Sequence, residues 1–179
     1  IFESKNIESV ICINKADLGS AAEIAELSDQ FTKAGYKVIV MDAKSGMGIN
    51  LIESYIMGKV CIFAGQSGVG KSTVLNMFMG SNVMETGGLS EKISRGKHTT
   101  RHAQFVETAG GYIVDTPGFS SLESGLLEPE DIKMLYKEFV LFSETCRLKG
   151  CMHINEPDCA VKSAVSKGLI SKSRHERYV

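Results

Sequence analysis

One octapeptide constrains the fold of this chain more than any other stretch. Residues 65–72 read Gly-Gln-Ser-Gly-Val-Gly-Lys-Ser and follow the apolar run 60–64, Val-Cys-Ile-Phe-Ala. This is the phosphate-loop pattern, in which two glycines bracket four residues and are followed by Lys and Ser or Thr. Glycines allow backbone N–H groups to turn toward phosphate oxygens, and the next helix directs its positive end at the same anion. The pattern predicts a strand, a phosphate-binding loop and a helix over 73–79.

Each residue of the loop has an expected role. Lys71 is expected to contact the terminal phosphates, and the hydroxyl of Ser72 to bind magnesium. The motif alone specifies neither the nucleotide nor the purpose of its binding. The other residues assigned to the phosphates are Gly65, Gln66, Ser67, Gly68, Val69, Gly70 and Thr73.

Predicted strands and helices alternate up to the loop. Strands are predicted at 7–13, 36–41 and 59–64, and helical periodicity lies at 18–34 and 49–56. This order is typical of a parallel sheet covered by helices on both faces. After the loop, the polar stretch 82–101 is long for a passive connection and is expected to be functional or mobile. A hairpin is predicted at 102–107 and 112–115, and helices at 129–139, 157–167 and 171–179.

A string at 14–17, Asn-Lys-Ala-Asp, indicates which nucleotide binds. The carboxylate of Asp17 can accept hydrogen bonds from N1–H and the exocyclic amine of guanine, whereas adenine has no donors there. Asn14 can brace the loop and bond the base. The turn 42–44, Asp-Ala-Lys, can offer a backbone N–H to the base oxygen, although both strings also occur in ordinary turns. The residues assigned to guanine are Asn14, Lys15, Asp17, Ala43 and Lys44.

Residues beyond the phosphate loop complete the predicted magnesium site. Asp115, at the end of a predicted strand, can hold the ion through water, and the N–H of Gly118 can contact the γ-phosphate. A turn or helix-cap role is the alternative for Asp115. Thr99 or Thr100 can close on magnesium when the γ-phosphate is present, and the sequence does not separate the two.

Three of the five cysteines gather with one histidine toward the end of the chain, as Cys146, Cys151, His153 and Cys159. Three thiolates and an imidazole suit tetrahedral zinc, and four protein ligands leave no position for a catalytic water. We therefore expect one structural zinc that stabilises a segment too small for a core of its own. Redox-active thiols are the alternative, although the spacing contains no Cys-x-x-Cys.

Charge divides unevenly along the chain. Residues 1–146 carry 13 Lys and Arg against 18 Asp and Glu, and residues 147–179 carry 7 against 3. The basic tail suggests an anionic partner such as nucleic acid, and a solvated surface with chance asymmetry is the alternative. No apolar run reaches the roughly 18 residues of a membrane span, so no membrane partner is expected. The expected phosphate contacts of the tail are Arg147, Lys149, Lys162, Lys167, Lys172, Arg174 and Arg177.

The motif order is unusual, because the guanine-reading strings precede the phosphate loop. A doubly wound sheet accommodates this when its original termini are joined and new ones open at the surface. With Gly-Lys-His-Thr-Thr-Arg at 96–101, Asp-Thr-Pro-Gly-Phe at 115–119 and the Cys/His cluster, essentially the whole chain resembles the circularly permuted, ribosome small-subunit-dependent GTPases of the RsgA/YjeQ family. One departure is Asp42, where that family usually has serine, which leaves the bracing of the 42–44 turn open.

The resemblance implies an α/β fold with two domains. A circularly permuted P-loop GTPase domain, with a mostly parallel sheet and helices on both faces, is expected at 1–140. A small helical zinc-binding domain is expected at 141–179, and we expect it to be truncated at its C-terminus. The N-terminal OB-fold domain of the family has no counterpart here, so we expect a partial chain. A cytoplasmic monomer that contacts the small ribosomal subunit and its rRNA is expected.

Catalysis lacks one familiar residue. Ras-type GTPases place a Gln just after Asp-x-x-Gly to orient the attacking water, and Phe119 stands there in this chain. Such a site is expected to hydrolyse GTP slowly until a partner completes it. His98 can orient the water, a role that the resemblance also implies; an exposed loop histidine without a task is the alternative. The residues assigned to catalysis are Lys71, His98, Thr99 and Thr100.

Three functions are compatible with these motifs. The first is an enzyme that binds GTP or GDP with magnesium and hydrolyses GTP to GDP and phosphate during late small-subunit assembly. The second is a GTP-dependent RNA- or ribosome-binding module in which hydrolysis is incidental. The third, a zinc-stabilised RNA-binding protein with a vestigial nucleotide pocket, is disfavoured by the intact motif set. Guanine-selective binding separates the third from the others, and turnover with small subunits tests the first.

Overall fold

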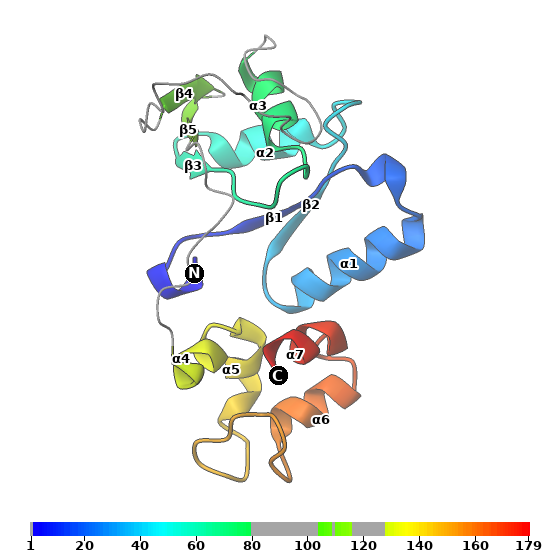
Figure 1. Ribbon diagram of the computed structural model, residues 1–179, viewed down its shortest axis with the longest axis vertical. Helices are drawn as coiled ribbons and strands as arrows, with labels where there is room; N and C mark the ends of the chain where they lie inside the picture. The colour runs from blue at the N-terminus through cyan, green and yellow to red at the C-terminus, as the bar shows by residue number, and fades with distance from the viewer. Residues whose placement is uncertain (1, 80–103, 109, 116–127) are drawn as a thin grey trace, which may run out of the picture. The chain divides into compact units, whose positions relative to one another are not determined.

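The computed structural model of the protein describes residues 2–79, 104–108, 110–115 and 128–179 (Figure 1). The chain divides into two compact units, each made of separate stretches. The first, called the helical unit, consists of Ile1–Ile11, Ala21–Val38 and Glu123–Val179. The second, called the sheet unit, consists of Cys12–Ser20 and Ile39–Leu122.

The described strands form two sheets. One contains β1 (Val10–Ile13) and β2 (Lys37–Val40), and in the other β5 (Gly111–Asp115) lies between β3 (Val60–Ile62) and β4 (Gln104–Thr108). β3 and β5 are parallel, with Cys61 opposite Ile113, whereas β4 and β5 are antiparallel. The predicted hairpin and the α/β class are confirmed, and β5 has one parallel and one antiparallel neighbour.

Helix α2 (Ile49–Ile56) has the bounds that the sequence predicts. Ile49, Ile52 and Ile56 are buried, and their spacing of three and four residues places them on one face of the helix. Gly48 precedes the helix with a φ of 80°. A Cβ there would lie 2.7 Å from the carbonyl oxygen of Val40, so only glycine fits between the end of β2 and the start of α2.

The helical unit contains five described helices and a small core. Its helices are α1 (Ala21–Lys33), α4 (Pro129–Met134), α5 (Lys137–Ser143), α6 (Ala160–Ser166) and α7 (Lys172–Tyr178). Phe139 and Val161 are fully buried, and Ile170 is nearly so. The thiols of Cys151 and Cys159 belong to the same cluster of buried residues. The cysteines therefore fill part of the volume of this core.

The prediction of one helix over 129–139 is wrong, because the chain forms α4 and α5 with a break at Tyr136. The backbone of Tyr136 is extended, with φ −89° and ψ 92°. This break turns the ring of Tyr136 onto Phe139, at a centroid distance of 4.8 Å, and onto Tyr178, at 5.4 Å. Aromatic packing thus overrides a helical periodicity that runs through the break.

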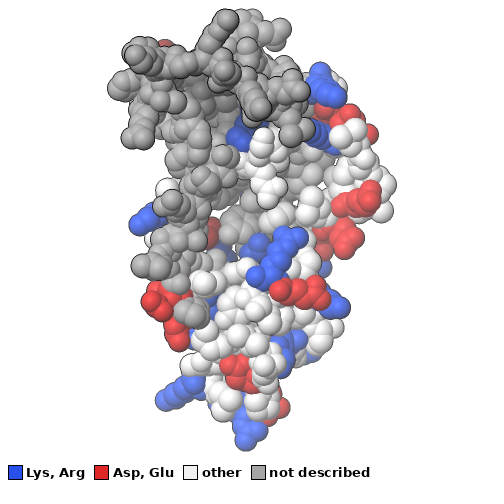
Figure 2. All heavy atoms as spheres, viewed as in Figure 1, with Lys and Arg blue, Asp and Glu red and all other residues white. Residues whose placement is uncertain are grey.

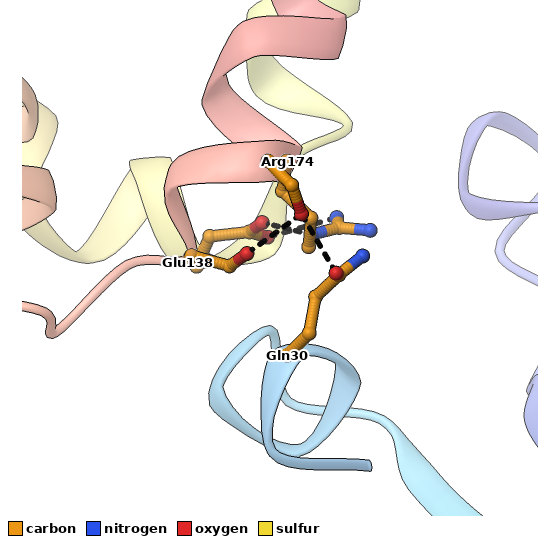
Figure 3. Close-up of polar contacts among 5 residues, drawn as sticks. Gln30, Glu138 and Arg174 are labelled. Atoms are coloured by element: carbon orange, nitrogen blue, oxygen red, sulfur yellow. Dashed lines mark hydrogen bonds and ion pairs between the residues drawn. The ribbon is translucent and has the colours of Figure 1, made fainter. Parts of the chain in front are cut away.

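A buried ion pair joins α7 to α5 (Figure 3). The guanidinium of Arg174 donates to both carboxylate oxygens of Glu138, one of these bonds being 3.2 Å, and the side chains are 13% and 2% exposed. The next residue along α7, Ser173, donates its hydroxyl to Oε1 of Gln30 on α1 at 2.7 Å. Helix α7 is therefore bonded to two helices that are distant in sequence.

Aromatic rings surround the same guanidinium. The Arg174 Cζ lies 5.8 Å from the ring centroid of Phe31, 5.7 Å from that of Tyr36 and 5.0 Å from that of Tyr136. The prediction that Arg174 contacts phosphate is wrong, because its charge is committed to Glu138 and its faces to these rings.

Other charges of the basic tail remain exposed. Arg147 pairs with Asp158 at 2.7 Å and Lys172 with Glu176 at 3.6 Å, all four side chains being more than half exposed. On the face shown in Figure 2, the basic and acidic side chains of the described residues are interspersed. Among the residues described, no helix combines the length and apolar character needed to cross a membrane.

Candidate functional site

The phosphate loop connects β3 to α3 (Lys71–Met79) in the sheet unit. Gly65, Gly68 and Gly70 have φ values of 151°, 79° and 100°, which favour glycine, and they curl the loop. The Lys71 ammonium donates to the carbonyl oxygens of Gly65, at 2.6 Å, and Gln66, at 2.8 Å. The ammonium group of Lys71 therefore lies across the loop in which phosphate is predicted to bind. The loop residues Ser67 and Val69 are exposed.

Asn14 joins the loop to both predicted guanine segments. Its side-chain Nδ2 donates to the carbonyl oxygen of Val69 at 2.8 Å, and its Oδ1 accepts from the N–H of Ala43 at 3.0 Å. A Cβ at Gly70 would overlap Nδ2 of Asn14, so this glycine is also needed for the close approach. The carboxamide of Asn14 therefore holds Val69 and Ala43, which lie 55 and 29 positions away in sequence.

The two guanine segments are also tied through their backbones. The N–H of Ala16 donates to the carbonyl oxygen of Met41 at 3.1 Å. Lys15 has a left-handed φ of 63°, and the short 3-10 helix η2 (Ala16–Leu18) follows it. Asp17 lies in η2 and is exposed, so its carboxylate is accessible to a ligand. Ala43 is buried, whereas Lys44 is exposed.

The magnesium residues are only partly placed. Ser72 and Thr73 lie in the first turn of α3, next to the phosphate loop. Asp115 ends β5, and because β5 runs parallel to β3, its backbone reaches the sheet edge from which the phosphate loop departs. The side chain of Asp115, and the whole of His98, Thr99, Thr100 and Gly118, lie outside the described residues.

The four predicted metal ligands come together in the helical unit. Their ligand atoms, from Cys146, Cys151, His153 and Cys159, all lie within 4.8 Å of one another. The Cys146 and Cys159 sulfurs are 3.9 Å apart, and Nδ1 of His153 is 3.7 Å from the first and 3.4 Å from the second. Tetrahedral zinc with bonds of about 2.3 Å to sulfur and 2.0 Å to nitrogen requires separations of about 3.8 and 3.5 Å. The donor set fits zinc.

A hydrogen bond selects the ligating nitrogen of His153. Ser143 donates its hydroxyl hydrogen to the carbonyl oxygen of Phe139 at 2.7 Å, so its oxygen must accept from Nε2–H of His153 at 3.1 Å. The proton then resides on Nε2, and Nδ1 directs a lone pair at the sulfurs. Burial and the nearby Lys133 hold the pKa of His153 below its usual value, which favours the neutral form that binds metal.

The thiols differ in their environments. Burial raises the pKa of Cys151 to about 11. Burial also acts to raise the pKa of Cys146, but N–H groups of Ala160 and Val161 outweigh it and the pKa lies below its usual value. Cys159 caps α6, its sulfur accepting from the N–H of Lys162 at 3.5 Å. These N–H groups stabilise thiolates, the form that a metal requires.

Three supporting residues escaped the sequence reasoning. Glu156 accepts the N–H groups of Met152, at 2.7 Å, and Ile154, at 2.9 Å, and so fixes the loop on both sides of His153. Ser143 orients the imidazole, and Asp42 organises the turn that it begins. Serines and acids are too common for a single sequence to mark such roles. The one signal in the sequence is Asp42 itself, which stands where the resembled family usually has serine.

A family model of the RsgA GTPase matches residues 1–125 of the chain. The small ribosomal subunit biogenesis GTPase RsgA of Clostridium beijerinckii is 45% identical over 178 residues, which cover 99% of this chain and 61% of that protein. The protein of that name from Caldanaerobacter subterraneus is 42% identical over 180 residues, which cover 100% and 61%. The chain thus spans about three fifths of the length of these relatives.

Solved structures share the fold. The crystal structure of YjeQ from Thermotoga maritima superposes with a TM-score of 0.76 and 37% identity, covering 99% of this chain and 59% of that chain. YloQ, described as a circularly permuted GTPase, gives a TM-score of 0.75 and 33% identity, covering 98% and 56%. With a family match over more than half of its length, the chain belongs to the RsgA GTPase family.

Proposed function

We propose that the chain carries the GTP-binding and GTP-hydrolysing part of an RsgA protein, which acts in the cytoplasm during late assembly of the small ribosomal subunit. It converts GTP to GDP and phosphate, slowly alone and faster on the subunit. The relatives' name, small ribosomal subunit biogenesis GTPase, supports the partner. We further propose a monomer, with a GTPase domain at 1–140 and a zinc-binding domain at 141–179.

One observation carries this proposal: the carboxamide of Asn14 lies between the phosphate loop and the turn of Ala43. A phosphate-binding loop and a base-reading turn that share one side chain place both ends of a nucleotide in a fixed relation. The exposed carboxylate of Asp17 follows three residues after Asn14, and guanine presents two donors to such a group. This arrangement supports guanine selectivity.

The chain's own residues have distinct tasks in the proposed reaction. The loop N–H groups and Lys71 bind the phosphates and balance their charge. Magnesium, when bound, neutralises charge on the β- and γ-phosphates, and Ser72 with Asp115 and Thr99 or Thr100 would hold it. His98 would orient the attacking water, because Phe119 has no polar atom for that task. Zinc, held by the Cys/His cluster, would stabilise the helical unit rather than take part in the reaction.

The experiment has a binding part and a turnover part. Nucleotide titration should give GDP binding at least about 100-fold tighter than ADP binding, because adenine leaves Asp17 unpaired. Asp17→Asn should reverse the preference from GDP to XDP, because the amide donates to the C2 oxygen of xanthine. GTP turnover is then measured with and without purified small ribosomal subunits.

The outcomes separate the candidate functions. A turnover rate that rises on the subunits, and no longer rises in His98→Ala, supports the enzyme. Guanine-selective binding with a rate that the subunits leave unchanged contradicts stimulated hydrolysis and favours a GTP-dependent binding module. Equal affinities for GDP and ADP would contradict the guanine site itself.

A further inference from the structure

Two side chains of α7 hold the stretch of chain that carries His153. This stretch, residues 151–154, is called the ligand loop. The hydroxyl of Tyr178 donates to the carbonyl oxygen of Met152 at 2.6 Å. Nε2 of His175 lies 2.8 Å from the carbonyl oxygen of His153, and because a carbonyl oxygen only accepts, the imidazole must donate. Two successive carbonyl groups of the ligand loop are therefore bonded to one helix.

These two carbonyl groups belong to the peptide planes on either side of the His153 Cα. The plane before it contains the carbonyl of Met152, and the plane after it contains the carbonyl of His153 itself. Because peptide groups are rigid, the conformation of a residue is given by φ and ψ, which describe how its two flanking planes are turned. Tyr178 and His175 together therefore fix both torsions of His153.

The backbone of His153 needs this support, because its φ is 63°. Such a left-handed conformation is uncommon for a residue with a side chain and persists where the surrounding structure holds it. The conformation also sets the direction in which the imidazole leaves the backbone. Nδ1 lies 3.4 Å from the Cys159 sulfur and 3.7 Å from the Cys146 sulfur, so a turn of either peptide plane would carry it away from the other ligands.

Two further residues restrain the ligand loop. Glu156 accepts the N–H of Ile154 at 2.9 Å, so the peptide plane after His153 is held at its nitrogen as well as at its oxygen. Nζ of Lys133, on α4, donates to the carbonyl oxygen of Cys151 at 3.3 Å. Three successive carbonyl groups of the ligand loop are thus bonded to side chains of α4 and α7.

Helix α7 is itself held by contacts that use no part of the ligand loop (Figure 3). Arg174 donates to Glu138 on α5, and Ser173 donates to Gln30 on α1. Residues 173–175 therefore reach α1, α5 and the ligand loop in turn. Because the bonds to α1 and α5 use no metal ligand, they hold α7 in place to present its two donors to the loop before a metal binds.

We propose that His175 and Tyr178 are positioning residues of the zinc site, which make α7 a clamp that sets the backbone of His153 in its ligating conformation. The inference rests on the proposed zinc site. A ligand whose backbone is already fixed loses less conformational freedom when it binds, so the clamp raises the affinity for zinc. The clamp bonds no ligand atom and acts through the backbone alone.

The zinc affinity of the full chain, measured by competition against a chromophoric chelator, tests the clamp. Tyr178→Phe removes one hydroxyl and keeps the ring, whose centroid lies 5.0 Å from that of Phe139. It should weaken zinc binding about 5- to 10-fold, the value of one hydrogen bond. Tyr136→Phe is the matched control and should keep the wild-type affinity. Its ring also packs on Phe139, and within the described part of the chain its hydroxyl bonds no residue of the ligand loop.

A double-mutant cycle separates positioning of His153 from general support of the fold. His175→Ala should weaken zinc binding by a similar factor, but the imidazole of His175 also lies 5.9 Å from the ring of Phe139, so its loss affects packing too. In a His153→Ala protein there is no imidazole to position. Adding His175→Ala to that protein should therefore change the zinc affinity by less than about 2-fold.

The outcomes distinguish the clamp from the zinc site itself. Wild-type zinc affinity in both Tyr178→Phe and His175→Ala would overturn the clamp and leave the zinc site intact. An equal loss from His175→Ala with and without His153 would also overturn it, because α7 would then support the fold rather than the imidazole. A wild-type chain that binds no zinc would overturn the proposed zinc site together with the clamp.

Discussion

At the scale of single residues, the contact between Ser143 and His153 determines which imidazole nitrogen can bind a metal. The serine hydroxyl has already donated its hydrogen to Phe139, so it can only accept from Nε2–H. Nδ1 is then free to ligate, 3.4 Å from the Cys159 sulfur. Such partners of a ligating histidine fix its ring as well as its tautomer.

Ser143→Ala is expected to lower zinc affinity about 10- to 100-fold, because the imidazole loses its orienting acceptor. Competition against a chromophoric chelator measures the affinity directly. Ser166→Ala is the matched control, since that hydroxyl bonds a carbonyl within its own helix, is exposed and is not bonded to the cluster. Equal affinities for both variants and the wild type would contradict the role of Ser143.

The four ligands could be predicted from sequence because zinc demands thiolates and imidazoles, which are rare enough to stand out in a short span. The phosphate loop could be predicted for the same reason, since its chemistry fixes glycines and a lysine at set positions. Ser143 and Asp42 could not. Their roles depend on which donors and acceptors the fold brings within hydrogen-bonding distance of their side chains. A single sequence does not reveal these contacts.

At the scale of elements, α7 holds the helical unit together through one buried charge pair. Glu138 is 2% exposed and Arg174 13%, so removing either partner leaves a charge in a poorly solvated site. The exposed pair on the same helix, Lys172 with Glu176, has side chains 82% and 60% exposed and should contribute little. Burial, rather than the number of pairs, decides their contributions.

Glu138→Ala is expected to lower the free energy of unfolding by about 3–5 kcal/mol, because Arg174 is left without a counter-charge. Glu176→Ala should change it by less than about 0.5 kcal/mol. The double variant Glu138→Leu/Arg174→Met should recover most of the loss. Urea titration of each variant gives these values, and a Glu138→Ala protein as stable as Glu176→Ala would contradict the argument.

Elements with one buried face were predictable, and those shaped by tertiary contacts were not. Ile49, Ile52 and Ile56 give α2 its bounds, since their spacing alone creates an apolar stripe. The break at Tyr136 was missed because it brings a ring onto Phe139 and Tyr178, which the local pattern does not contain. The antiparallel addition of β4 to β5 followed from the hairpin signal at its glycines.

At the scale of the molecule, each unit is assembled from stretches that are separate in sequence. Helix α1 belongs with the metal cluster in the helical unit, although over 100 residues separate them. The cluster's thiols are part of that unit's core, beside Phe139 and Val161. Metal binding and folding of this unit are therefore expected to be linked.

Chelation of the metal should raise amide hydrogen exchange in α5, α6 and α7, and also in α1, because Gln30 and the rings around Arg174 lose their partners. The strands β3, β4 and β5, which belong to the sheet unit, should keep their protection. Hydrogen exchange followed by mass spectrometry, with and without chelator, measures the protection of the helices and of the strands separately. Loss of protection in these strands as well would contradict separate cores, and unchanged protection in α1 would contradict its link to the metal cluster.

The hydrogen bond between Gln30 and Ser173 spans 143 positions, and this separation has a consequence for synthesis. Translation at about 5–20 residues per second delays the second partner by roughly 7–30 s after the first has been made. During that interval the face of α1 that carries Gln30 and Phe31 has no α7 to cover it. The nascent chain must therefore keep this surface from unproductive contacts until α7 has been made.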